Sequence, residues 1–324
     1  MRSLLLALSV IFIIGCSNEF ELNEPKVETP VVYGVLDPIN TNQFIRVERA
    51  FADPAVSALD IAQNPDSLYY EGITVKLIKG GVEYVGEEVD GADFGLPRDA
   101  DGAFASSPNT LYRFSTEALD FETGDNIQLS IEGIFDDSAV TSETTIIAAP
   151  GVSFPSPTGG SEFDFIEGQP LRFNWGAREG NVQYALELEF HVIEVNTTDG
   201  VQTPTSVVWQ LASSLEESEY VLDPQEFYQF MGAAFEPNDN VIRFIVNADY
   251  RLTAGDNSLA DLSRIASSNL GITASGEVPT YTNLSSGLGI FAAKHTVEVF
   301  DVGLGGDTKD SLRDGRFTKD LNFQ

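Results

Sequence analysis

Residues able to do acid–base or nucleophilic chemistry are few in this chain. It contains two histidines, His191 and His295, and one cysteine, Cys16, among 324 residues. Neither histidine has a second histidine or a cysteine at the spacing of a zinc site, and the sequence has no G-x-S-x-G nucleophile turn. Zinc chemistry and a Ser-His-Asp triad are therefore not expected, and we predict no catalytic residue.

Carboxylates are abundant, and they are densest in one predicted loop. Carboxylate oxygens are ligands that Ca²⁺ prefers, so this loop is a candidate calcium site. It lacks the EF-hand spacing and the terminal glutamate of that motif, and a solvated acidic loop is the alternative. No other cofactor is expected. The candidate ligands are Asp90, Asp93, Asp99 and Asp101.

A predicted helix that opens at Asp223 carries several aromatic side chains. Phe227 and Phe230 lie three residues apart and therefore share one face of the helix. These rings either pack the helix onto a sheet or contribute to an apolar surface for a partner. The candidate partner patch adds part of a glycine-rich segment and comprises Phe227, Tyr228, Phe230, Leu288 and Phe291.

The first 16 residues resemble a bacterial lipoprotein export signal. Arg2 is followed by a short apolar run and then by Ile14-Gly15-Cys16, which resembles the lipobox that is cut before its cysteine. The apolar run is too short to cross a hydrocarbon core of ~30 Å. We therefore predict a signal peptide over residues 1–15 and a lipid on Cys16; a plain secreted protein with a stray cysteine is the alternative.

Residues 16–29 are polar and acidic and form a predicted tether. The acidic residues behind Cys16 resemble the surface-export signal of Bacteroidota lipoproteins, whereas the alternative is an ordinary disordered stalk. The whole chain has 18 Lys and Arg against 50 Asp and Glu, a net charge of −32. This charge repels phosphate backbones and anionic headgroups, so we expect no nucleic-acid binding and a membrane anchor made by the lipid alone.

Short alternating runs bounded by turn-forming residues predict strands along most of the mature chain. We expect a β-sandwich-like domain over residues 30–149, with one short helix that opens at Asp53-Pro54 and ends at Asn64. A proline-rich crossover then leads to a second domain over residues 150–304. Residues 305–324 are a predicted charged, mobile tail.

Residues 184–192 have the clearest periodic pattern, because apolar and charged residues alternate there at period two. Only a strand with one buried face fits that alternation. Together with residues 171–175, this strand looks like part of a fibronectin type III or immunoglobulin-like sandwich. The prediction is a mainly all-β protein of two tandem β-sandwich domains, the second fibronectin type III or immunoglobulin-like, with short helices inserted after Asp223 and near Asn257.

Four segments are similar to uncharacterised cell-envelope lipoproteins of Bacteroidota, a family of the domain-of-unknown-function type. They are Thr29–Pro38, Ile45–Val47, Ala50–Phe51 and Ser286–Phe291. The resemblance implies an outer-membrane or cell-surface location and, by analogy, an accessory role beside a TonB-dependent receptor. It implies no active site.

A resemblance to the Bacteroidota O-glycosylation sequon, Asp-Ser followed by an aliphatic residue, occurs three times. It makes Ser67, Ser138 and Ser311 candidate modification sites. A modified serine must be accessible, so we expect all three in exposed loops.

These observations together favour a non-enzymatic lipoprotein, anchored in the outer membrane and exposed at the cell surface, that binds an envelope protein or a glycan. Two alternatives stay open. One is a surface hydrolase that uses carboxylates on glycan or peptide, for which a cleft with two water-poor carboxylates is required. The other is a passive envelope or adhesion spacer, which needs no concave or apolar surface.

Overall fold

The computed structural model describes residues 29–50, 57–268 and 281–324. The predicted signal peptide, Cys16 and all but the last residue of the predicted tether lie outside these ranges, and so do residues 53–56 of the first predicted helix. Among the helices of the described ranges, none combines the length and the apolar character needed to span a membrane.

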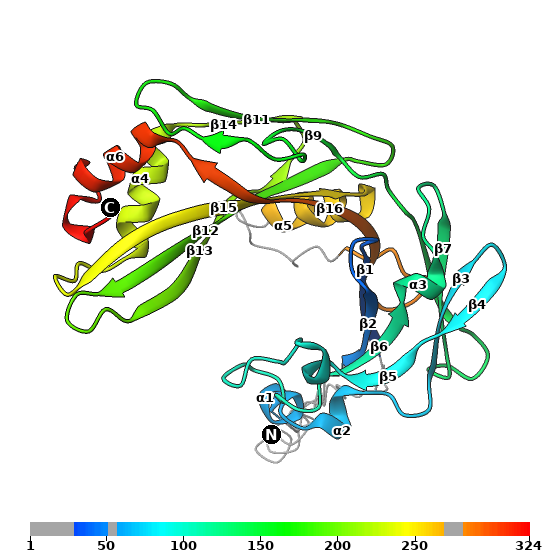
Figure 1. Cartoon of the computed structure of the whole chain (residues 1–324). Helices are drawn as coiled ribbons and strands as arrows, with labels where there is room; N and C mark the ends of the chain where they lie inside the picture. Colours follow the sequence, from blue (N-terminus) through cyan, green and yellow to red (C-terminus); the bar gives the residue numbers. More distant parts are fainter. Residues whose placement is uncertain (1–28, 51–56, 269–280) are drawn as a thin grey trace, which may run out of the picture.

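One long sheet of nine strands runs through the molecule (Figure 1). Its N-terminal strand pairs with its C-terminal strand in parallel, so the first and last strands of the described chain lie side by side within the sheet. In spatial order the strands are β13 (Gln202–Leu215), β12 (Gln183–Asn196), β15 (Val241–Gly255), β16 (Leu288–Leu304), β1 (Thr29–Leu36), β2 (Asn42–Ala50), β6 (Thr110–Ser115) and β5 (Glu87–Asp90), and β10 (Glu162–Phe163) pairs with β16.

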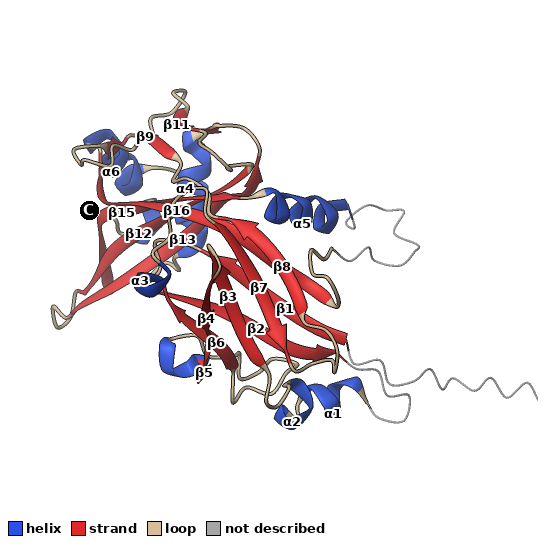
Figure 2. Cartoon of the chain, turned by 90° about the vertical axis from the view of Figure 1, so that its right-hand side faces the viewer, coloured by secondary structure: helices blue, strands red, loops and turns tan. Residues whose placement is uncertain are grey.

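A four-stranded sheet packs on the part of the long sheet made by β1, β2 and β6 (Figure 2). The two sheets bury one hydrophobic cluster, to which Val32 and Ile45 come from the long sheet and Leu77 and Leu129 from the smaller one. This half is a β-sandwich. The smaller sheet consists of β4 (Val82–Val85), β3 (Thr74–Lys79), β7 (Asn126–Glu132) and β8 (Val140–Thr145). The connections between strands in this half of the molecule contain the short helices α1 (Ala58–Ala62), α2 (Pro65–Leu68), η1 (Gly91–Phe94) and α3 (Thr116–Leu119).

A second cluster lies on the other half of the long sheet. It is covered by a three-stranded sheet of β14 (Glu219–Leu222), β11 (Leu171–Gly176) and β9 (Gly151–Phe154), and by α4 (Pro224–Ala234) and α6 (Gly306–Asp314). The expected alternation in β12 is confirmed, since its apolar residues are buried: Tyr184, Leu186, Leu188, Phe190 and Val192. The mainly β fold with few, short helices is confirmed as well.

Strand β16 belongs to both halves. Phe291 lies in the first cluster, whereas Ala293 lies in the second. The clusters divide between Ile146 and Ile147, close to the expected crossover, but the hydrogen bonds of the long sheet continue across both halves. Gly289 has φ +116° and faces Val32 so closely that a Cβ would collide with the carbonyl oxygen there, which explains the glycine pattern at the start of β16.

The predicted mobile tail over residues 305–324 is wrong. These residues form α6 and η2 (Lys319–Leu321), and Leu312 and Phe323 are each 1% exposed in the second cluster. The guanidinium of Arg243 donates to the carbonyl of Leu321 at 2.8 Å and holds the segment against β15. The many charged residues of this segment suggested a mobile tail. Its few apolar side chains nevertheless pack on the core, and Arg243, which is distant in the sequence, helps to hold them there.

The predicted short helices have mixed outcomes. The helix after Asp223 is confirmed as α4, because the Asp223 carboxylate accepts from the N–H of Gln225 at 2.9 Å and Pro224 occupies the first turn. The helix near Asn257 is confirmed as α5 (Asn257–Ser268), which lies against β16. The predicted end at Asn64 lies two residues beyond the end of α1 at Ala62, and Asn64 itself caps a further helix, α2.

Candidate functional site

A groove of about 540 Å³ lies between α4, α6 and the loop that follows Phe165. We call it the α4–α6 groove. Aromatic rings and polar side chains share its lining, which includes Glu167, Gln225, Tyr228, Asp310, Asp314 and Phe317. The volume is within the ~300–1,000 Å³ typical of small-molecule sites.

The α4 wall of the groove is held by the aromatic core beneath it. Phe227 is fully buried and stacks on Phe165, with ring centroids 3.9 Å apart at 12°. Tyr228, one position further along the helix, lines the groove, and its hydroxyl donates to the Phe165 carbonyl at 2.6 Å. Burial raises the pKa of Tyr228 above the usual tyrosine value, so its hydroxyl is protonated at neutral pH.

The α6 wall begins where the chain leaves β16. The buried Thr308 hydroxyl accepts from the N–H of Phe165 at 2.8 Å and fixes the start of α6 beside the core. Beyond the helix, the Arg316 guanidinium lies 4.4 Å from the centroid of the Phe317 ring. Gly232 lets the Phe317 backbone pack close to α4, because a Cβ at Gly232 would lie 2.7 Å from the Phe317 carbonyl oxygen.

The acidic groups of the groove are in contact with water. Arg313 pairs with Asp310 at 2.8 Å and with Asp314 at 3.0 Å, and the two carboxylate side chains are 66% and 72% exposed. Glu167 is exposed too. These carboxylates can accept hydrogen bonds from a ligand, but they lack the water-poor surroundings of a carboxylic acid that protonates a leaving group.

The predicted partner patch is wrong as a single surface. Phe227 and Phe291 are fully buried and belong to different clusters. The Phe230 ring stacks on Trp209 at 4.8 Å, and Leu288 pairs with β1 through Val31 at the start of β16. The three-residue spacing of the phenylalanines marks the core face of α4, and Tyr228 is the member of the patch that lines the groove.

The predicted calcium loop does not gather its four aspartates. Asp90 caps η1 by accepting from the N–H of Ala92 at 3.0 Å, and it also accepts from the N–H of Asn109 at 3.1 Å. Asp99 accepts from the N–H of Asp101 at 3.0 Å. Within the described ranges, no three of Asp90, Asp93, Asp99 and Asp101 form a group of ligand atoms within 4.8 Å. The carboxylates of Asp90 and Asp99 therefore shape the loop backbone.

Of the three candidate glycosylation sites, Ser138 is as expected: it lies exposed in the loop between β7 and β8. The expectation of an exposed loop is wrong for Ser67 and Ser311, which are half-buried in α2 and α6. The expectation came from the accessibility that modification needs, and the three-residue motif itself carries no information on whether its serine lies in a loop or a short helix.

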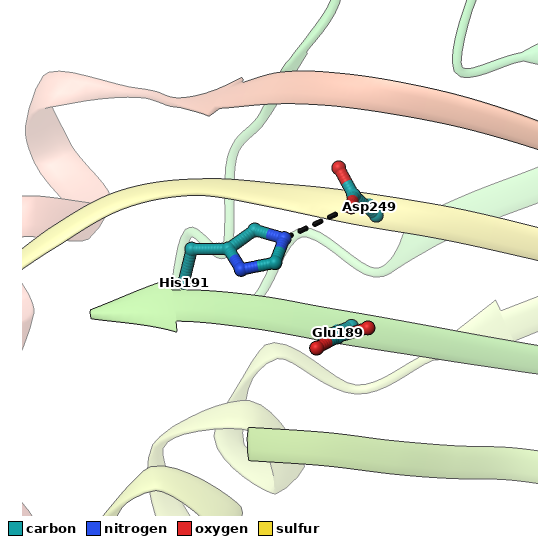
Figure 3. A group of neighbouring side chains, drawn as sticks. All are labelled: Glu189, His191 and Asp249. Atoms are coloured by element: carbon teal, nitrogen blue, oxygen red, sulfur yellow. Dashed lines mark hydrogen bonds and ion pairs between the residues drawn. The ribbon is translucent and has the colours of Figure 1, made fainter. Parts of the chain in front are cut away.

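A second polar group lies on the face of the long sheet opposite the core (Figure 3). It consists of Glu189 and His191 on β12 and Asp249 on β15, all half-buried, with one ligand atom from each within 4.8 Å of the others. His191 Nε2 lies 2.9 Å from Asp249 Oδ2. The other oxygen, Asp249 Oδ1, accepts from the N–H of Asp301 at 3.0 Å.

Sequence reasoning missed this group because its members come from two strands. The alternation in residues 184–192 predicts that Glu189 and His191 share the polar face of their strand. Asp249 comes to lie opposite Glu189 only through the pairing of β12 with β15, which is a long-range contact. The alternating polar face of β15, which also has Asn247 and Arg251, is the signal that could have suggested a partner strand.

Comparisons with known proteins add little to these observations. No protein-family model and no curated protein matches the chain. Among solved structures, the chicken CNTN1 FN1-FN3 domains match at 10% sequence identity and a TM-score of 0.18, over 83% of this chain and 66% of that one. The chain thus spans slightly less than two thirds of that structure, and a TM-score this low does not indicate a shared fold.

Proposed function

We propose that this protein is a lipid-anchored binding protein of the outer membrane, displayed at the cell surface, and that its α4–α6 groove takes a glycan. The observation that carries the binding role is the groove itself, where the rings of Tyr228 and Phe317 lie among exposed carboxylates and the Gln225 amide. The anchor rests on the lipobox-like sequence that ends at Cys16.

The lining of the groove suits a neutral sugar. The C–H face of a sugar ring packs on aromatic rings, and its hydroxyls donate to carboxylate oxygens and exchange hydrogen bonds with amides. A net charge of −32 disfavours anionic polymers as ligands. Exposure of Asp310 and Asp314 supports binding over two-carboxylate hydrolysis, and a concave aromatic groove is more than a passive spacer needs.

Location is tested with a Cys16→Ser variant and the wild-type protein in the producing cells. We expect the wild-type protein to be found in the membrane fraction. We also expect it to be degraded when intact cells are treated with a protease, because the lipid holds it on the outer surface. The variant should leave the membrane fraction. A wild-type protein that resists the protease until cells are broken would place it on the periplasmic side and contradict surface display.

Binding in the groove is tested with Phe317→Ala. Titration of the purified protein with members of a neutral oligosaccharide panel should identify a ligand, and the variant should bind it at least ~10-fold more weakly because an aromatic contact is lost. Phe300→Ala is the matched control, since Phe300 is 58% exposed on β16 and does not line the groove. Equal loss in both variants, or none in either, would contradict binding in the groove.

A further inference from the structure

The group on the outer face of the long sheet has the donor set of a cation site. It offers one imidazole nitrogen and two carboxylates, from His191, Glu189 and Asp249, close enough for a single ion to reach one atom of each. Three protein ligands with nitrogen and oxygen donors are the pattern of Zn²⁺ sites that keep an open coordination position.

The strand register supplies a physical reason for a cation at this place. Glu189 and Asp249 are directly opposite each other in the antiparallel pair of β12 and β15. Like charges in such a pair destabilise a sheet, so a positive charge between them is needed to relieve the repulsion. A bound metal ion can provide this charge.

The surroundings of the group favour a metal ion. Beside it lies a shallow depression of about 570 Å³, whose lining includes Glu189, His191, Asn247 and Asp301. No lysine or arginine is among the described residues that line this depression. The depression leaves room for water or a further ligand on the open side of an ion. Arg251, the nearby cation on the same face, is already paired with Glu187 and Glu298.

Neighbouring groups also hold the donors in place. The Asp301 N–H fixes Asp249 Oδ1 at 3.0 Å, and Asp301 adopts φ +59° where the register of β16 shifts against β15. Asn247, which is opposite His191, donates to the Asp301 carboxylate at 2.5 Å. Its side-chain oxygen is buried and has no hydrogen-bond partner among the described residues. Such outer contacts orient metal ligands, and the orphaned oxygen beside them is an acceptor for a hydrogen bond from a metal-bound water.

We infer that Glu189, His191 and Asp249 form a divalent transition-metal site of the Zn²⁺ type on the outer face of the long sheet. The imidazole selects such ions over Ca²⁺ and Mg²⁺, which prefer oxygen ligands. The site is separate from the α4–α6 groove, because no residue lines both the groove and the depression.

The test is titration of the chelator-treated protein with Zn²⁺ by calorimetry, with Ca²⁺ as the comparison. We expect one Zn²⁺ per chain, binding at least tenfold tighter than Ca²⁺, and a rise in melting temperature with added Zn²⁺. His191→Ala, Glu189→Gln and Asp249→Asn should each weaken Zn²⁺ binding at least tenfold. The two isosteric variants keep the test valid should His191→Ala fold poorly.

Glu298→Gln is the control, because Glu298 lies on the same face of the sheet but outside the group. It should bind Zn²⁺ like the wild-type protein. The inference is overturned if the wild-type protein takes up no Zn²⁺, if the three variants bind it as tightly as Glu298→Gln does, or if Ca²⁺ binds more tightly than Zn²⁺. Each of these results leaves glycan binding in the groove unaffected.

Discussion

Asp256→Ala is expected to lower the free energy of unfolding by about 4 kcal/mol, because it leaves three donors without their acceptor. One oxygen of Asp256 accepts from the Leu259 N–H at 3.0 Å and caps α5. The other accepts from the Ala293 N–H at 2.9 Å and from the Thr144 hydroxyl at 2.8 Å, both in buried surroundings. A single carboxylate thus joins α5, β16 and β8, which belong to both halves of the molecule.

Urea denaturation of wild type and variant measures this loss. The matched control is Asp223→Ala, which removes an exposed cap from α4 and should cost only about 1 kcal/mol. If Asp256→Ala costs no more than Asp223→Ala, the buried hydrogen bonds to β16 and β8 do not hold the two halves together.

Arg243→Met is expected to lower the free energy of unfolding by about 3 kcal/mol, since it preserves volume but removes a buried charge and its hydrogen bonds. Arg243 is only 4% exposed, and its guanidinium carbon lies 4.9 Å from the Phe235 ring centroid. It donates to Glu194 at 2.8 Å and to the carbonyls of Leu321 at 2.8 Å and Glu236 at 3.1 Å. The C-terminal segment that forms one wall of the groove depends on these bonds.

Denaturation again measures the effect, and limited proteolysis shows where it acts. We expect cleavage after α6 in the variant under conditions that leave the wild-type protein intact. Arg172→Met is the control, because the Arg172–Glu219 pair is 56% and 47% exposed and should contribute less than about 1 kcal/mol. Equal stability of the two variants would show that Arg243 does not anchor the C-terminal segment.

The parts of the fold that could be predicted are those that depend on local pattern. Alternation in residues 184–192 marks a strand with one buried face, and Asp223-Pro224 marks a helix start, because both signals arise from neighbouring residues. The parallel pairing of β1 with β16 could not be predicted, since it joins strands more than 250 residues apart in the sequence. Docking of residues 305–324 escaped prediction for the same reason.

The candidate sites depend even more on long-range contacts. The groove combines residues near 167, 225 and 315, and the cation group combines residues 58 positions apart, His191 and Asp249. Sequence spacing carries no information on such pairs without the strand register. Conversely, the calcium prediction for the loop around Asp90 rested only on the number of carboxylates there. Asp90 and Asp99 instead accept hydrogen bonds from backbone N–H groups and stabilise the loop.

Whether the α4–α6 groove holds a glycan is decided by a crystal structure of the protein grown with the tightest-binding member of the oligosaccharide panel. We expect a sugar ring packed between Tyr228 and Phe317, with its hydroxyls hydrogen-bonded to Asp310, Asp314 or Gln225. A sugar bound on any other surface, or a panel in which no oligosaccharide binds, would contradict it.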